Sequence, residues 1–133
     1  MKKYNEINNN FLNLIKIVEK LRDKKNGCLW CNSQTSESIA EYSIEEANEV
    51  IEAINNGDNS NICEELGDLL FQVIFHSQIK SDEKKFDIND VIKSINKKMI
   101  RRNPHVFDNK NKKKYTLNEI EKNWIKIKNE EKN

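Results

Sequence analysis

The sequence predicts an all-α protein. Apolar residues recur at helical spacing in five segments, and a turn or a capping pattern separates each segment from the next. The chain contains only three glycines and one proline, which leaves little material for the turns of a β protein, and no segment indicates a strand. We therefore expect helices packed against each other as antiparallel hairpins.

Two helices are predicted on either side of an irregular loop, which covers residues 23–34. The first helix covers residues 10–21, with an apolar stripe of Phe11, Leu14, Ile15, Val18 and Leu21. The second begins at about Ser36 and has a stronger start at Ser43, where Ser43 and Glu46 have the spacing of a capping box. Its apolar stripe consists of Ile44, Ala47, Val50, Ile51 and Ile54.

Three more helices follow the turn-forming residues 55–61. The third covers about residues 62–80, and the fourth opens with Asp87 as its cap and ends at Asn103-Pro104. Residues 110–115 form a basic loop. After this loop, Thr116 and Glu119 have capping-box spacing at the start of a last helix.

Composition limits the class of protein. A chain of 133 residues without a repeat or a long linker is predicted to form a single domain over residues 1–133. A net charge of +1 does not favour nucleic acid or an anionic membrane as a partner, and no apolar run approaches the roughly 20 residues of a membrane span. The polar N-terminus does not resemble an export signal, so we expect a cytoplasmic protein with reduced cysteines.

Four acids stand out around the central turn. Glu46 and Glu49 are three residues apart, as are Glu65 and Asp68, so each pair points to one side of a helix, about 60° apart. In an antiparallel hairpin centred on Gly57, Glu49 lies level with Glu65, because both are eight residues from the centre. Glu46 lies level with Asp68, eleven residues from the centre. The pattern therefore predicts four carboxylates at one height.

Such a group of carboxylates needs a cation. Four close anions repel each other, and their pKa values rise unless a positive charge compensates. Mg²⁺ fits best, because it accepts carboxylates, retains water ligands and bridges substrate phosphates, and Mn²⁺ is a substitute.

The third predicted helix supports a lined cavity. From Leu69 to Phe75 it is apolar almost all round, which is typical of a buried helix. Its polar residues fall within roughly 80° of one another on a helical wheel, namely Glu65, Asp68, Gln72 and His76. Three of the four acids also have a simpler interpretation: Glu46 caps a helix, Glu49 belongs to a solvated face, and Glu65 is favoured by a helix N-terminus.

The acids and their neighbours resemble the MazG family of nucleoside triphosphate pyrophosphohydrolases. That family has two acids, two further residues, a third acid and, after a gap, an E-x-x-D pair, as in Glu45, Glu46, Glu49, Glu65 and Asp68. Residues 21–35, 65–73 and 101–107 are also similar to family segments, in the same order, so the likeness covers nearly the whole chain.

The resemblance implies an activity and a subunit type. It implies that Glu46, Glu49, Glu65 and Asp68 bind Mg²⁺ in a four-helix subunit, here with a further C-terminal helix, and usually in a homodimer or higher assembly. The implied reaction is hydrolysis of an NTP or dNTP at the α–β bond to the monophosphate and pyrophosphate. Many family members remove unwanted nucleotides from the pool.

Other residues are assigned by position and charge. Glu45, beside the metal ligands, is predicted to orient or deprotonate the attacking water, and its alternative is a solvated first-turn acid. Trp30 is predicted to stack on the nucleobase, or else to cover the core. Leu29 and Cys31 stand where the family often has Pro and Asp, which leaves the substrate preference open. The predicted phosphate contacts are Lys98, Arg101, Arg102 and His105, although cations at a helix C-terminus are also favoured by its dipole.

Two other classes of function deserve comparison. Cys28 and Cys31 form a C-x-x-C motif, but one such pair is a weak zinc signal, and a redox motif is expected where a strand meets a helix. The main alternative is a MazG-like module that binds nucleotides or a partner protein. Such a module would hydrolyse nucleotides weakly or not at all.

Overall fold

The structure is a computed structural model that describes residues 2–133, and it is built from helices, with no strand in that range. The predicted all-α class is therefore confirmed. The helices are α1 (Lys2–Leu21), α2 (Leu29–Ser33), α3 (Ser36–Ile39), α4 (Tyr42–Asn56), α5 (Asn59–Asp82), α6 (Ile88–Arg102), α7 (Pro104–Phe107) and α8 (Leu117–Glu131). They form two units, one ending at Ile88 and one covering Asn89–Asn133. None of the helices described over residues 2–133 combines the length and apolar character needed to cross a membrane.

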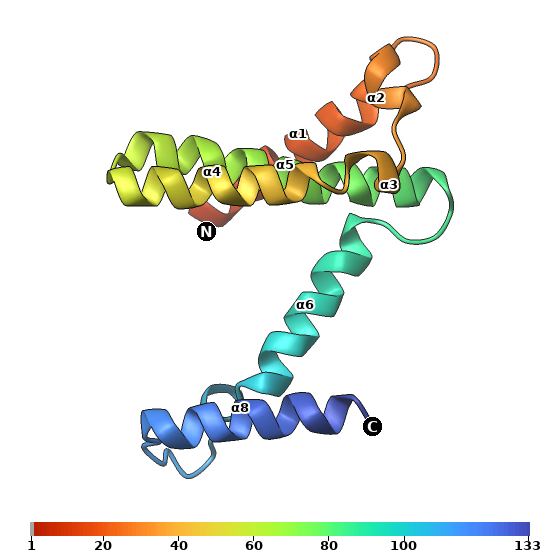
Figure 1. Ribbon diagram of the computed structural model, residues 1–133. Coiled ribbons are helices and arrows are strands. Elements are labelled where there is room, and N and C mark those ends of the chain that lie inside the picture. The colour runs from red at the N-terminus through yellow and green to blue at the C-terminus, as the bar shows by residue number, and fades with distance from the viewer. Residues whose placement is uncertain (1) are drawn as a thin grey trace. The chain divides into compact units, whose positions relative to one another are not determined.

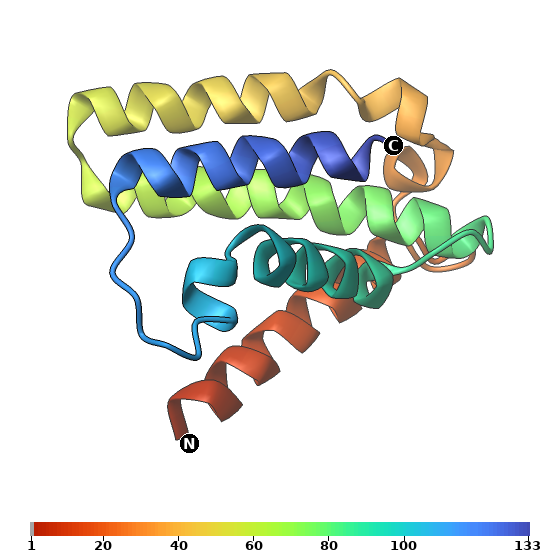
Figure 2. The same cartoon turned by 90° about the horizontal axis from the view of Figure 1, so that it is seen from below.

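The centre of the first unit is the hairpin of α4 and α5, which run antiparallel and side by side (Figures 1 and 2). Gly57 ends α4 in the left-handed conformation, with φ of 72°, and its N–H donates to Ala53 O and Ile54 O at 3.1 Å. Asp58 then caps α5, since its side chain accepts from the N–H groups of Ser60 and Asn61. The predicted turn over residues 55–61 is therefore shorter than expected, because both helices extend into it.

The other helices of this unit pack against α5. α1 and α3 both contact α5. A buried cluster joins Cys31 of α2, Ile39 of α3 and two residues of α5, Phe75 and Ile79, each at most 7% exposed. The cluster holds the short helices α2 and α3 on the C-terminal half of α5.

Two local predictions about the start of this hairpin are wrong. α4 begins at Tyr42, so Ser43 lies inside the helix and does not cap it, and the N-cap residue Glu41 makes no side-chain cap. The capping box of this region is formed by Thr35 and Ser38 at the start of α3. The predicted irregular loop contains α2, which is preceded by a tight turn at Gly27. A Cβ atom at Gly27 would lie 2.4 Å from Asp23 O, so only glycine fits that turn.

The second unit contains α6, α7 and α8. Thr116 caps α8 as predicted, because its hydroxyl accepts from Glu119 N–H at 3.2 Å. Glu131, at the other end of α8, accepts from Arg101 Nε at 2.9 Å and from Arg102 Nη2 at 3.0 Å, which ties the end of α6 to α8. These two bonds lower the pKa of Glu131 to about 2, with Arg102 the larger cause.

Candidate metal centre

The antiparallel hairpin brings four acids together, as their spacing predicts. Glu46 and Glu49 of α4 and Glu65 and Asp68 of α5 each offer a carboxylate oxygen, and these four oxygens lie within 4.8 Å of one another. Glu46 and Glu65 are half-buried, whereas Glu49 and Asp68 are exposed. We call these four residues the acid cluster.

The acid cluster carries uncompensated negative charge. Glu49 is hydrogen-bonded to Glu65, and this bond, together with burial and the charges of the other acids, raises the pKa of Glu65 to about 7. Burial is the main cause that raises the pKa of Glu46, followed by its hydrogen bond with Glu49. The proximity of the other acids therefore favours the protonated form of Glu65 when no cation neutralises the cluster.

Oxygens of the cluster that lack a hydrogen-bond partner indicate whether a metal ion fits there. Among residues 2–133, Glu46 Oε2 and Glu65 Oε2 are buried without a hydrogen-bond partner, as is Gln72 Oε1, one helical turn beyond Asp68 on α5. Buried acceptors without donors are costly, and all-oxygen donors are the ligands of hard divalent cations. The cluster therefore fits a divalent metal ion, with two orphaned carboxylate oxygens available to it.

Two further residues with a predicted catalytic or substrate-binding role lie in the first unit, which contains the acid cluster. Glu45 lies in the first turn of α4, exposed and adjacent to Glu46. Trp30 of α2 is 52% exposed, and its ring lies 6.3 Å from Tyr42, the first residue of α4, and 6.4 Å from Phe75. Trp30 thus covers part of the core and also presents a ring to solvent, so both of its predicted roles stay open.

The predicted phosphate contacts all lie in the second unit. Lys98 is half-buried on α6, and His105 of α7 lies 6.1 Å, between ring centroids, from Tyr115. Arg101 and Arg102 share Glu131, and Arg102 also lies over the ring of Trp124, 5.3 Å from its centroid. The structure therefore gives these two arginines structural partners that the sequence did not reveal.

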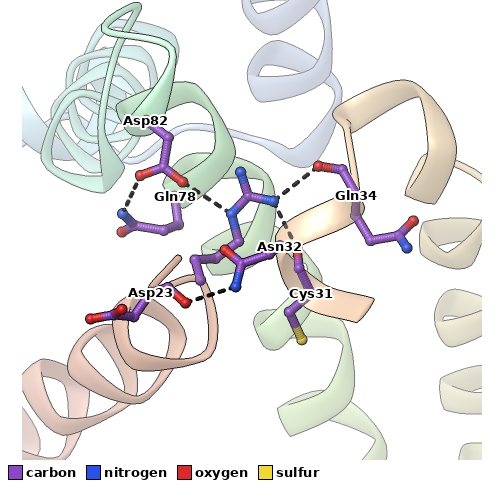
Figure 3. Close-up of polar contacts among 7 residues, drawn as sticks. Asp23, Cys31, Asn32, Gln34, Gln78 and Asp82 are labelled. Carbon is purple, nitrogen blue, oxygen red and sulfur yellow. Dashed lines mark hydrogen bonds and ion pairs between the residues drawn. The ribbon is translucent and has the colours of Figure 1, made fainter. Parts of the chain in front are cut away.

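The structure also shows an arginine that sequence reasoning missed. Arg22, directly after α1, donates from Nη1 to Cys31 O at 2.8 Å and Gln34 O at 2.9 Å, and from Nε to Asp82 at 3.0 Å. Figure 3 shows these contacts and the neighbouring bond from Gln78 to Asp82. Arg22 thus binds the last carbonyls of α2 and joins them to the end of α5. An arginine beside a loop was its only signal in the sequence.

We expect Arg22→Met to lower the free energy of unfolding by about 3 kcal/mol, because two partly buried hydrogen bonds from a charged donor to carbonyls are lost. Asp82→Asn is the matched variant, since it removes the ion pair and leaves both carbonyl bonds. Its cost should stay near 0–1 kcal/mol, as for an exposed pair. Urea unfolding followed by circular dichroism measures both, and equal effects would contradict this division.

The comparisons with known proteins identify the family of this chain. Residues 34–107 match the MazG nucleotide pyrophosphohydrolase domain family, and this segment contains all four acids. The chain belongs to this family. The MazG resemblance seen in the sequence is confirmed.

Several relatives have the same type of domain. The chain is 43% identical over 118 residues to the nucleoside triphosphate pyrophosphohydrolase of Escherichia coli K12 and 46% identical over 122 residues to that of Thermotoga maritima. Each alignment covers about nine-tenths of this chain but only 44% and 45% of the relative, so the chain spans less than half the length of these curated relatives. A crystal structure of a MazG-related protein from Thermotoga maritima matches with a TM-score of 0.71 and 29% identity, covering 88% of this chain and 97% of that one.

Proposed function

We propose that this MazG-family chain is a Mg²⁺-dependent nucleoside triphosphate pyrophosphohydrolase that cuts the α–β bond and releases the monophosphate and pyrophosphate. The observation that carries the proposal is the acid cluster, with its orphaned oxygens of Glu46 and Glu65. The similar relatives from E. coli and T. maritima are named for this class of hydrolase. Removal of unwanted nucleotides in the cytoplasm is the physiological role that we propose.

The chain's own residues would divide the work as follows. Glu46, Glu49, Glu65 and Asp68 would hold the ion, which would supply Lewis-acid activation of water and charge neutralisation for the leaving pyrophosphate. Glu45 orients the attacking water and accepts its proton at the carboxylate, for which an exposed acid beside the cluster is suited. Trp30 stacks on the base. Phosphate contacts are assigned to Lys98, Arg101, Arg102 and His105.

A product assay tests this proposal. The protein is incubated with a panel of NTPs and dNTPs in Mg²⁺ or Mn²⁺, and the products are separated by ion-exchange chromatography. Monophosphate and pyrophosphate in equal amounts are expected. Diphosphate and orthophosphate would reject the α–β assignment, and binding without turnover on any nucleotide would favour the alternative of a non-hydrolysing module.

For Arg102→Ala we expect a rise in the nucleotide KM of roughly 10-fold to 100-fold, which corresponds to one lost charge-assisted hydrogen bond to phosphate. The matched variant is Glu131→Gln, because it weakens the same ion pair and keeps the guanidinium. Its KM should change little. Steady-state kinetics on both variants separates the roles, and equal KM values in the two would assign Arg102 to holding α6 on α8 alone.

We further propose that the chain forms a homodimer or higher homo-oligomer. Both helices of the central hairpin expose large apolar side chains that are 40–65% accessible: Ile44, Ile51 and Ile54 on α4 and Leu66, Leu70 and Val73 on α5. Large apolar side chains exposed in such numbers are typical of a protein interface. Light scattering coupled to size-exclusion chromatography would show a monomeric mass if this proposal is wrong.

A further inference from the structure

Two of the three cysteines lie side by side at the start of α2. Cys28 is the residue that precedes the helix, with an extended backbone (φ −90°, ψ 124°), and Cys31 is the third residue of the helix. Cys28 packs against the buried cluster that contains Cys31. Cys63, on α5, is exposed and lies outside both the C-x-x-C motif and the buried cluster. The structure thus places both cysteines at one buried cluster, which strengthens a motif that is a weak signal by itself.

The two thiols have different surroundings. Cys31 is 7% exposed within the buried cluster, against Ile39, Phe75 and Ile79, whereas Cys28 is half-buried at the edge of that cluster. The hydrogen bonds from the backbone and side chain of Cys31 lower the pKa of Cys28, and burial raises the pKa of Cys31. An accessible thiol that ionises more readily therefore stands in front of a shielded one.

The backbone that carries this pair is fixed from two sides. Arg22 donates to Cys31 O at 2.8 Å, and Asn32 donates from its side chain to Asp23 O at 2.7 Å and from its backbone N–H to Cys28 O at 2.9 Å. In Figure 3 the Cys31 sulfur points away from these polar contacts. The thiols can therefore react without breaking the bonds that hold the loop.

We propose that Cys28 and Cys31 are a thiol-modification site that forms a reversible intrachain disulfide by exchange with a small disulfide such as oxidised glutathione. The Cys28 thiolate attacks one sulfur of the small disulfide, and a mixed disulfide forms as the first small thiolate leaves. The Cys31 thiol loses its proton to solvent and attacks the Cys28 sulfur, which expels the second small thiolate. Two protein thiols are oxidised and one small disulfide is reduced to two thiols.

Zinc binding fits this pair of cysteines less well than disulfide formation does. Structural zinc sites use four ligands. Over residues 2–133, the acid cluster is the only group of three or more potential metal-ligating side chains, and it contains neither cysteine. Disulfide exchange needs only the two sulfurs that the structure places together.

The test uses the full chain with Cys63→Ser, which removes the exposed third thiol. The protein is equilibrated in mixtures of reduced and oxidised glutathione, quenched with acid, alkylated and analysed by intact-mass and peptide mass spectrometry. We expect the loss of two hydrogens without a glutathione adduct, a peptide in which Cys28 is bonded to Cys31, and full reversal by excess reduced glutathione.

Two single variants in the same background test the order of attack. Cys31→Ser should accumulate one glutathione on Cys28, because no second thiol can displace it. Cys28→Ser should remain unmodified in the folded protein, because Cys31 is shielded, and should react once urea unfolds it. The proposal is overturned if the parent protein keeps both thiols at every glutathione ratio, or if it holds a stable glutathione adduct as Cys31→Ser does. Equal modification of Cys31 in folded Cys28→Ser would also overturn the assigned order. None of these outcomes depends on nucleotide hydrolysis.

Discussion

Asp68→Asn is expected to abolish nucleotide hydrolysis and to leave the helical circular dichroism spectrum unchanged. Asp68 is an exposed member of the acid cluster and lies on the surface of α5 that faces α4, so the substitution removes one negative oxygen without creating a cavity. Changing a residue behind a metal ligand already costs about 10–100-fold, so losing a ligand should cost more than about 100-fold in kcat/KM. Pyrophosphate release measured at saturating Mg²⁺ tests this expectation.

Glu64→Gln provides the control. Glu64 lies on the same helix, is also exposed, and loses the same charge on substitution, but it is not one of the four clustered acids. It should retain activity within about 3-fold, since a surface charge change has little effect away from a site. Activity retained in Asp68→Asn would remove that residue from the site, and equal losses in both variants would indicate a general charge effect.

The acid cluster could be predicted because an antiparallel hairpin converts sequence spacing into height. Counting from Gly57 places Glu49 level with Glu65, and in the structure the carboxylate oxygens of both belong to the group that lies within 4.8 Å. The same reasoning does not predict which oxygens remain without partners, since that depends on how deeply α4 and α5 pack. The Ser43 capping box was wrong for a related reason. Capping spacing is a local pattern, and α4 begins one residue before Ser43 without a side-chain cap, whereas Thr35 caps α3.

Contacts between distant segments were beyond prediction from spacing. Arg22 meets Asp82 across 60 positions, and Arg102 meets Glu131 across 29. Each arginine satisfies an acid or a carbonyl whose place depends on the packing of other helices. Local patterns gave the helices and the hairpin register, whereas these long-range polar contacts depend on tertiary packing.

Adding a divalent metal ion should stabilise the protein much more at pH 8 than at pH 5.5. Metal ligands must be deprotonated, and the pKa of Glu65 is raised to about 7, so at pH 5.5 protons compete with the ion. At pH 8, a metal concentration of about 100 times its Kd contributes about 2.7 kcal/mol, which is a rise of roughly 10 °C in Tm. Differential scanning calorimetry with Mg²⁺ or with a chelator measures the difference.

The metal-free protein should show the opposite dependence on pH. A carboxyl whose folded pKa lies above its unfolded value near 4.5 favours the folded state when protonated, so its contribution is present below about pH 4.5 and is lost as pH rises to about 7. Glu131 does not affect the change in stability between pH 4.5 and 7, because its pKa is lowered to about 2. Its contribution to stability is lost only as pH falls below about 4.5. Glu65→Gln isolates the cluster: in chelator its stability should vary less between pH 4.5 and 7 than that of the parent. If Mg²⁺ shifts Tm equally at pH 8 and pH 5.5, or equally in Asp68→Asn, the ion binds somewhere other than the acid cluster.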